Sequence, residues 1–262
     1  MDNRSIYLRK LVLRGLKGGR RGHIGSSLSL VELIRVIYDN FLRFNKNKKS
    51  IDKFILSKGH GCLALYAILV DKRFFSVKEL DKYCKPDSIL GGHPEKHIPG
   101  VEVATGALGH GLSIAVGFAL SSRIKRKKNY VYVLMGDGEL DEGSVWEAAL
   151  MASKHKLNNL TLIIDYNKMQ AAGPVSDILP LEPLRDKWKA FGFNVFEIDG
   201  HNVDQIYQCL SMCRDYNNKP NLVIANTIKG KGISFAENNP DMTHKPFIDD
   251  KLIAKLFKAL EK

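Results

Sequence analysis

Two polar side chains follow apolar runs of the chain, each at the point where its run ends. Asp137 stands between two glycines directly after residues 130–135, and Asn167 follows residues 160–164. Carboxylate and amide oxygens are hard ligands that suit Mg²⁺ or Ca²⁺, and Mg²⁺ favours sites completed by water and phosphate oxygens. The pattern indicates a divalent-cation site. A surface turn at Asp137 and a strand-end cap at Asn167 are the alternative interpretation.

The elements around these two residues have to bring them together. Both apolar runs are short enough for buried strands, and residues 144–155 have the spacing of an amphipathic helix between them. The apolar side of that helix is expected to hold Trp146, Ala149 and Leu150. Short strand–helix–strand connections usually make the two strands neighbours. Since ligands bind at the carboxyl ends of parallel strands, Asp137 and Asn167 are expected to meet there.

A glycine-rich segment and several histidines add to this candidate site. Residues 105–111, Thr-Gly-Ala-Leu-Gly-His-Gly, directly precede a predicted helix, so their amides could cradle an anion. Such a pattern is also common in ordinary helix caps. Histidine can donate to a sugar hydroxyl or move a proton near neutral pH, although a lone histidine is more often structural. Histidine stands beside glycine at His23, His60, His93 and His110.

Strands alternate with helices along the whole sequence, which predicts an α/β fold with a mostly parallel sheet and helices on both faces. Glycines after residue 14 are expected to end the first helix. Ser29 with Glu32 forms a capping box that is expected to open a further helix, whose apolar residues repeat at helical spacing from Leu30 to Phe41. Segments 84–111 and 171–180 are expected to be irregular. Strands are predicted over residues 53–56, 130–135, 160–164, 194–198 and 222–226, and helices over 5–16, 62–70, 110–127, 144–155, 184–191, 203–214 and 250–260.

Composition narrows the class of protein. The chain has 262 residues, a formal net charge of +12 and four cysteines. No apolar run approaches the ~20 residues of a membrane span, and the first residues lack a signal-peptide apolar region, so a cytoplasmic protein is expected. The basic residues are scattered, which favours sugar phosphates and an acidic partner chain over nucleic acid. Cys209 and Cys213, one helical turn apart, are expected to be packing residues.

The motifs together resemble a known family. Gly-Asp-Gly around Asp137, with Asn167 thirty positions later, is similar to the thiamine-diphosphate motif. From about residue 5 to residue 236 the chain resembles the amino-terminal half of transketolase, in the form that is split over two polypeptides. The resemblance implies a thiamine-diphosphate-binding fold, with residues 1–262 forming a single diphosphate-type domain. The pyrimidine-binding and C-terminal domains are expected to be absent.

The resemblance also implies which residues hold the cofactor. Asp137, Asn167 and the carbonyl of Met169 would hold the metal, Mg²⁺ or Ca²⁺. The thiamine diphosphate contacts that it implies are His60, Gly106, Ala107, Leu108, Asp137, Gly138, Glu139 and Asn167.

Three of the histidines take catalytic roles by the same resemblance. Gly-His-x-Gly would place His23 near the substrate carbonyl and C1 hydroxyl. Ser-Lys-Gly-His would place His60 beside the cofactor and the donor sugar, and Gly-Gly-His-Pro-Glu supplies His93. His110 is expected to be part of the loop structure.

Two further roles come from the resemblance. Acidic residues after the Gly-Asp-Gly motif would join a proton-linked network between two active sites, here Glu142 and Glu147. Transketolases also carry a histidine soon after a Lys-Gly-Lys-Gly loop. In this sequence that position falls on Thr243, and a slip of one residue would bring His244 into the role.

The implied reaction needs a second chain. A partner with the pyrimidine-binding domain would complete each active site, giving a heterotetramer in which two copies of this chain touch. Together they would transfer a two-carbon ketol group from a ketose, or its phosphate, to an aldose. A subunit of a thiamine-diphosphate-dependent 2-oxo acid decarboxylase or dehydrogenase, or of a deoxyxylulose-phosphate synthase, is an alternative. A non-catalytic cofactor-binding module is another.

Overall fold

A parallel sheet carries the chain's polar strand ends to one edge. The computed structural model describes residues 1–170, 172–215 and 218–261. Within them the strands lie in the order β1-β2-β3-β5-β4, and every neighbouring pair is parallel. The strands are β1 (Lys53–Leu56), β2 (Val131–Gly136), β3 (Leu160–Tyr166), β4 (Asn194–Asp199) and β5 (Asn221–Asn226). The central strands β2 and β3 are buried along their whole length, as their apolar runs require.

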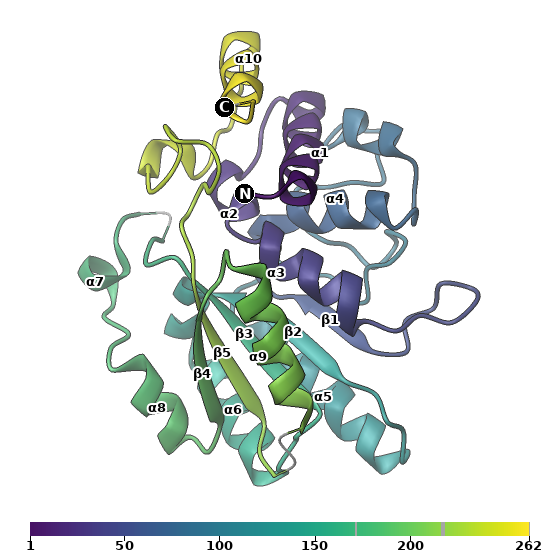
Figure 1. Cartoon of the computed structure of the whole chain (residues 1–262), viewed down its shortest axis with the longest axis vertical. Coiled ribbons are helices and arrows are strands. Elements are labelled where there is room, and N and C mark those ends of the chain that lie inside the picture. The colour runs from purple at the N-terminus through teal and green to yellow at the C-terminus, as the bar shows by residue number, and fades with distance from the viewer. Residues whose placement is uncertain (171, 216–217, 262) are drawn as a thin grey trace.

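Helices cover both faces of this sheet (Figure 1). One face and its surrounding core belong to α1 (Asn3–Gly19), α3 (Val31–Val36), α4 (Cys62–Asp71), α9 (Val203–Asp215) and α10 (Asp250–Ala259). The other face is covered by α5 (His110–Ile124), α6 (Gly143–Lys154) and α8 (Leu184–Ala190). The predicted α/β class, with a mostly parallel sheet and helices on both faces, is confirmed.

Alternation along the strands divides the core into two layers. Leu134, Ile163 and Val223 are cross-strand neighbours, and all three belong to the core on the α1 and α9 side. Their sequence neighbours, such as Val133 and Leu162, belong to the core on the α5 and α6 side. Successive side chains of a strand point to opposite faces, so an unbroken apolar run contributes side chains to both core layers.

Short elements occupy the connections. These are α2 (Ile24–Leu28), the π-helical turn η1 (Ile37–Phe41), α7 (Val175–Ile178) and the 3₁₀ turns η2 (Gly59–Gly61), η3 (Val77–Lys82), η4 (Asp137–Asp141) and η5 (Pro240–Met242). The segment 84–109 is irregular, as predicted. The segment expected to be irregular from Ala171 to Pro180 contains α7, and Ala171 lies outside the described residues.

The prediction that glycines end the first helix after Leu16 is wrong. Helix α1 continues to Gly19, and Arg20 closes it in the left-handed conformation at φ 54°. Its glycines are contact points: a Cβ at Gly15 would lie 2.5 Å from Leu63 Cδ2, and one at Gly18 would lie 2.2 Å from the Leu80 carbonyl oxygen. Close packing against α4 and η3 therefore outweighs the low helix propensity of glycine.

The predicted capping box of Ser29 and Glu32 is also wrong. The Ser29 hydroxyl donates to Asp165, and Glu32 is paired with the buried Arg9 at 2.6 Å. Both side chains serve distant partners, and the segment forms separate short helices.

The apolar side of α6 was predicted correctly at Ala149, which is buried, and wrongly at Leu150, whose side chain is 59 % exposed. Cys209 and Cys213 are buried packing residues, as expected. Within the described residues, no helix is both long and apolar enough to cross a membrane.

Replacing Gly18 with alanine tests the close packing of α1. Alanine normally stabilises a helix relative to glycine by about 0.5–1 kcal/mol. The new methyl group at residue 18 would overlap backbone of η3, so we expect Gly18→Ala to lower the free energy of unfolding by about 1–3 kcal/mol. The matched control is Gly117→Ala in α5, where a Cβ would meet nothing within 4 Å, and which should stabilise the chain. Urea denaturation of both variants measures the two effects. If both substitutions changed the free energy of unfolding in the same direction, the packing argument would be contradicted.

Candidate functional site

A pocket of about 290 Å³ lies at the carboxyl edge of the sheet. The pocket lies between the ends of β2 and β3 and loops that come from the first and the last part of the chain. Its lining consists of His23, Ser26, Lys58, His60, Leu108, Gly136, Asp137, Gly138, Glu139, Asn167, Met169, Gln170, Lys229, Thr243 and His244.

Asp137 and Asn167 meet in this pocket as predicted. Gly136 pairs with Asp165 across β2 and β3, which places the residues that follow each strand side by side. Both side chains are almost fully buried, and the Asp137 carboxylate accepts hydrogen bonds from the backbone of Gly138 at 2.9 Å and Lys168 at 2.6 Å. Asn167 Oδ1 accepts from the amide of Met169 at 3.1 Å.

The Met169 carbonyl, the third predicted metal ligand, lines the same pocket and accepts a hydrogen bond from Lys229 Nζ at 2.7 Å. Among the described residues, no three His, Cys, Asp or Glu side chains are grouped to hold a metal ion. A divalent cation here would use one carboxylate, one amide oxygen and one carbonyl oxygen. That donor set fits a hard cation whose remaining ligands are waters and phosphate oxygens.

Buried charges surround these oxygens. Burial, with the nearby Asp165 carboxylate, raises the pKa of Asp137 to about 6. Burial, with the nearby Lys58 ammonium, lowers the pKa of Lys229 to about 8. Burial opposes ionisation of Asp165, but its ion pair with Lys58 keeps the pKa of that carboxyl below its ordinary value. The carboxylates at this end of the pocket therefore favour bound cations.

Glu139 ties the glycine-rich loop to the end of β2. One of its oxygens accepts from Ser57 Oγ at 2.7 Å and from the Gly109 amide at 3.1 Å, and the other accepts from the Gly136 amide at 3.0 Å. Gly109 has a φ of 78°, and the helix α5 begins directly after it. Glu139 was predicted as a cofactor contact. It lines the pocket, and its oxygens position the loop.

The other predicted loop residues are divided between two hollows. Leu108 lines the main pocket, whereas Ala107 lines a neighbouring hollow together with His110. Gly106 has a φ of 137°, and a Cβ there would lie 2.7 Å from the ring of His93. Only glycine lets the loop pass this close to the histidine.

Four histidine rings converge at this pocket: His23, His60 and His244 line it, and His93 lies outside the lining against His60. The ring of His23 is stacked on His244 at 4.4 Å between centroids and meets His60 edge-on at 4.8 Å. His60 in turn meets His93 edge-on at 4.9 Å. These rings come from four separate loops, so the structure brings together all four histidines predicted for catalysis.

Burial keeps two rings of the cluster, His23 and His60, neutral at physiological pH. Burial, and then the neighbouring His60, lowers the pKa of His23 to about 3. Burial, and then His93, lowers the pKa of His60 to about 4. His23 Nδ1 is buried and has no hydrogen-bond partner within the described chain. An unpartnered buried polar atom facing a pocket is available to a polar ligand.

Thr243 and His244 are adjacent in sequence but make different contacts in the pocket. Both residues line the pocket, but Thr243 is buried with an unpartnered hydroxyl, whereas His244 stacks on His23. A backbone bridge between Gly22 and Lys245 holds His244 beside the loop that carries His23. Of these two residues, His244 is the one that contacts the other histidines.

Some predicted residues lie outside the pocket. Glu142 is exposed at the start of α6, and Glu147 is exposed one turn later. His110 is exposed at the start of α5. Conversely, Ser26, Lys58, Gln170, Lys229 and Thr243 line the pocket without having been given a role there. Lys58 and Lys229 stand within the Ser-Lys-Gly-His and Lys-Gly-Lys-Gly segments, and that context was the signal that could have identified them.

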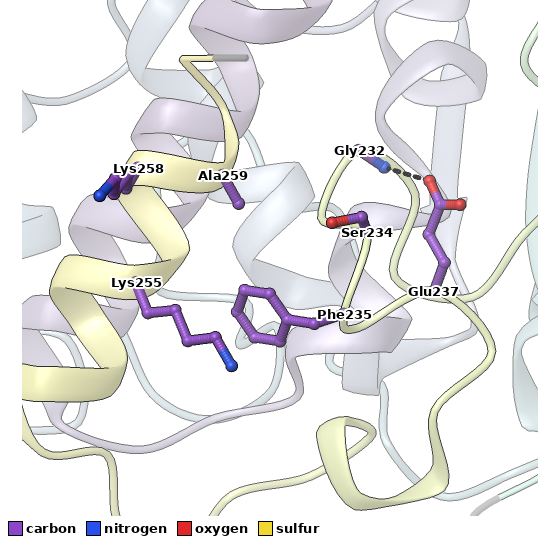
Figure 2. Close-up of a pocket in the computed structure, with 7 residues that line it drawn as sticks. All are labelled: Gly232, Ser234, Phe235, Glu237, Lys255, Lys258 and Ala259. Atoms are coloured by element: carbon purple, nitrogen blue, oxygen red, sulfur yellow. Dashed lines mark hydrogen bonds between the residues drawn. The ribbon is translucent and has the colours of Figure 1, made fainter.

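A second pocket, of about 380 Å³, lies between α10 and the loop after Gly232 (Figure 2). Lys255 reaches toward Phe235, with its Nζ 4.1 Å from the ring centroid, and Glu237 accepts from the Gly232 amide at 3.0 Å. None of the residues predicted for catalysis or cofactor binding lines this pocket. The histidine-lined pocket is therefore the candidate functional site.

Comparison with known proteins agrees with this geometry. The family described as transketolase, thiamine diphosphate binding domain, matches residues 2–260. One of the subunits of apulose-4-phosphate transketolase from Actinobacillus succinogenes is 45 % identical over 90 % of this chain and 87 % of its own length. The 6-deoxy-6-sulfo-D-fructose transketolase subunit of a Clostridium species is 41 % identical over 90 % of this chain and 88 % of its own. The chain belongs to the transketolase family.

Solved transketolases share the fold. The crystal structure of transketolase from Campylobacter jejuni superposes on the whole of this chain with a TM-score of 0.89 at 30 % identity. This chain covers 43 % of that longer polypeptide. The thiamine-diphosphate-binding fold predicted from the sequence is confirmed.

The lowered pKa of His23 makes the stability of this transketolase domain depend on pH. The folded pKa of His23 is below the value of about 6.5 for an unfolded histidine. The unfolded state therefore binds more protons as the pH falls below about 6.5, and the free energy of unfolding should fall with it. His60, His93, His244 and Lys229 face the same ring, so its protonation adds a cation among basic groups.

We expect His23→Gln to flatten the decline in stability between pH 7 and pH 4.5. Urea denaturation of the cofactor-free chain at several pH values measures the slope. The matched control is His110→Gln, since His110 is exposed and outside the cluster. A slope unchanged by His23→Gln would show that this ring is not buried in its neutral form.

Proposed function

We propose that this chain is the N-terminal subunit of a split transketolase that uses thiamine diphosphate and Mg²⁺. With a partner subunit it transfers a two-carbon ketol group from a ketose, or its phosphate, to an aldose. The observation that carries the proposal is that two sets of side chains with different chemistry line one pocket. Oxygens suited to a divalent cation lie at one end, and a cluster of histidine rings lies at the other.

Each end of the pocket has its own task. Asp137, Asn167 and the Met169 carbonyl would hold Mg²⁺, and the backbone of residues 106–108 with Gly138 would hold the diphosphate. Lys229, close to the Met169 carbonyl, adds a positive charge suited to phosphate oxygens. When bound, thiamine diphosphate supplies the nucleophilic carbon and the electron sink for ketol transfer.

The histidines are assigned to the donor sugar. A neutral imidazole can both donate and accept a hydrogen bond, and so it can hold a hydroxyl and move its proton. His23 has an unpartnered Nδ1 for this purpose, and His60 and His244 contact its ring. We assign His23, His60, His93 and His244 to binding the donor sugar and to proton transfer at its hydroxyl groups.

The relatives named as subunits support a two-chain enzyme. We propose that a C-terminal subunit contributes the pyrimidine-binding domain, and that two chains of each kind form a heterotetramer. Two copies of this chain would meet through α5 and α6, which lie side by side and leave Ile114, Leu150 and Met151 exposed. Glu142 stands at the start of α6, so this pairing would bring the two Glu142 side chains close to the interface.

Reconstitution with Asp137→Ala tests the reaction and the metal site together. The wild-type chain, mixed with the pyrimidine-domain chain of the same organism, thiamine diphosphate and Mg²⁺, should transfer ketol groups from ketose phosphates to aldose phosphates. Mass spectrometry of the sugar products measures this. Asp137→Ala should abolish transfer and weaken cofactor binding at least 100-fold in calorimetry, because the only carboxylate among the proposed ligands is lost. The fold should survive, since the side chain packs in no apolar core.

The control is Asp186→Ala, which removes an exposed carboxylate of α8. Unchanged cofactor affinity in Asp137→Ala would refute the assigned site. Ketol transfer by this chain alone would refute the two-chain enzyme, and steady release of carbon dioxide from pyruvate would favour the decarboxylase alternative.

Charge placed on the exposed face of α6 tests the pairing of two copies. Leu150→Glu should weaken self-association roughly tenfold or more, because an apolar contact is replaced by a charge that must be desolvated. Sedimentation velocity across a concentration series, with and without the partner chain, measures the change. Tyr207→Glu is the control, since Tyr207 is similarly exposed but lies on α9, across the sheet. Equal association of the two variants would place the interface elsewhere.

A further inference from the structure

The carboxylate of Asp165 lies directly behind the proposed metal ligands. Asp165 belongs to β3, two residues before Asn167, and is completely buried. In the described part of the chain its side chain accepts hydrogen bonds from Lys58 Nζ, from Ser29 Oγ at 2.7 Å, from Thr227 Oγ1 and from Asn167 Nδ2 at 3.1 Å. Both of its oxygens are therefore occupied by protein groups, and Asp165 is not placed to be a metal ligand itself.

The contact with Asn167 determines which way its amide faces. An ionised carboxylate only accepts hydrogen bonds, so Asn167 must present its NH₂ group to Asp165. The amide NH₂ lies 3.1 Å from Asp165 Oδ2 and 3.3 Å from the Asp165 carbonyl. The amide oxygen is then left on the opposite side, where it accepts from the Met169 amide at 3.1 Å. A flipped amide would turn its NH₂ group toward a bound cation and could not ligate it.

Asp165 is itself held from three other segments. Lys58 follows β1, Ser29 lies between α2 and α3, and Thr227 follows β5. These donors approach the carboxylate from separate elements, so it cannot rotate without losing a buried hydrogen bond. The orientation of Asn167 thus depends on the packing of the whole sheet edge.

We propose that Asp165 is the positioning residue that holds the Asn167 amide oxygen toward the Asp137 carboxylate and the Met169 carbonyl. The inference rests on the proposed metal-dependent function of this pocket. Outer-shell partners of this kind fix the orientation of a ligand, and their loss typically weakens metal binding about 10–100-fold.

The first variant is Asp165→Asn, which keeps the volume of the side chain and removes its fixed acceptor character. We expect the affinity for Mn²⁺, used as a probe for Mg²⁺, to fall about 10–100-fold in the presence of thiamine diphosphate. Electron paramagnetic resonance of free Mn²⁺ measures this without turnover. The matched control is Asp186→Asn, which makes the same chemical change at an exposed carboxylate of α8 outside this network. Its Mn²⁺ affinity should stay within threefold of wild type.

The combined variant Asp165→Asn with Asn167→Asp separates positioning from a merely structural role. It reverses donor and acceptor across the same contact and presents a carboxylate, which needs no orientation, to the cation. Net charge is preserved, and circular dichroism of each variant checks that any loss of Mn²⁺ binding does not reflect a lost fold. Mn²⁺ affinity should recover to within tenfold of wild type. Because the Lys58 partner at residue 165 is still missing, a purely structural role would not be rescued.

The outcomes distinguish this inference from the proposed function. Wild-type binding of Mn²⁺ and thiamine diphosphate, with Asp165→Asn binding equally well, would overturn the positioning role and leave the function standing. Failure of the combined variant to bind Mn²⁺, with a wild type that does bind, would also overturn it. A wild-type chain that binds neither would refute the proposed function, and the positioning role with it.

Discussion

The parallel register of β2 and β3 is the constraint on which the site depends. Because Gly136 pairs with Asp165, Asp137 and Asn167 emerge at the same level and on the same edge. A shift of one residue would turn every side chain of a strand to the opposite face of the sheet. The two apolar layers oppose such a shift, since Leu134 and Ile163 belong to one layer and Val133 and Leu162 to the other. The core therefore sets the position of the two polar residues as well as the stability of the chain.

The features predicted best from the sequence depend on local pattern. Strand β1 matches its predicted range, and the other strands agree to within one or two residues at each end, because uninterrupted apolar runs bounded by polar residues mark buried strands. The meeting of Asp137 and Asn167 followed from the same pattern together with the rule that parallel strand ends share an edge. The α/β class and the main part of the site were therefore predictable.

The sequence predictions were wrong where a residue contacts a partner that is far away in the sequence. Ser29 looked like a helix cap because its sequence neighbours fit a capping box, yet its hydroxyl donates to Asp165, 136 positions away. Gly18 looked like a helix breaker, yet it lies inside α1 against the backbone of η3. Likewise, the convergence of four histidines from four loops has no periodicity that a sequence could display. Only the resemblance to transketolases suggested it, and the bridge between Gly22 and Lys245 places His244 within it.

The pocket is divided between a charged end and a neutral end, and Lys229 connects them. At the charged end, its ammonium donates to the Met169 carbonyl and helps to keep Asp137 ionised against burial. The same ammonium is among the groups that lower the pKa of His23 and His60, after burial and the neighbouring rings. One cation therefore favours the anionic form of the acidic residue and the neutral form of the histidines. Under the proposed function, those are the forms that would ligate a cation at one end and exchange protons with sugar hydroxyls at the other. The two halves of the site are therefore electrostatically compatible at a single pH.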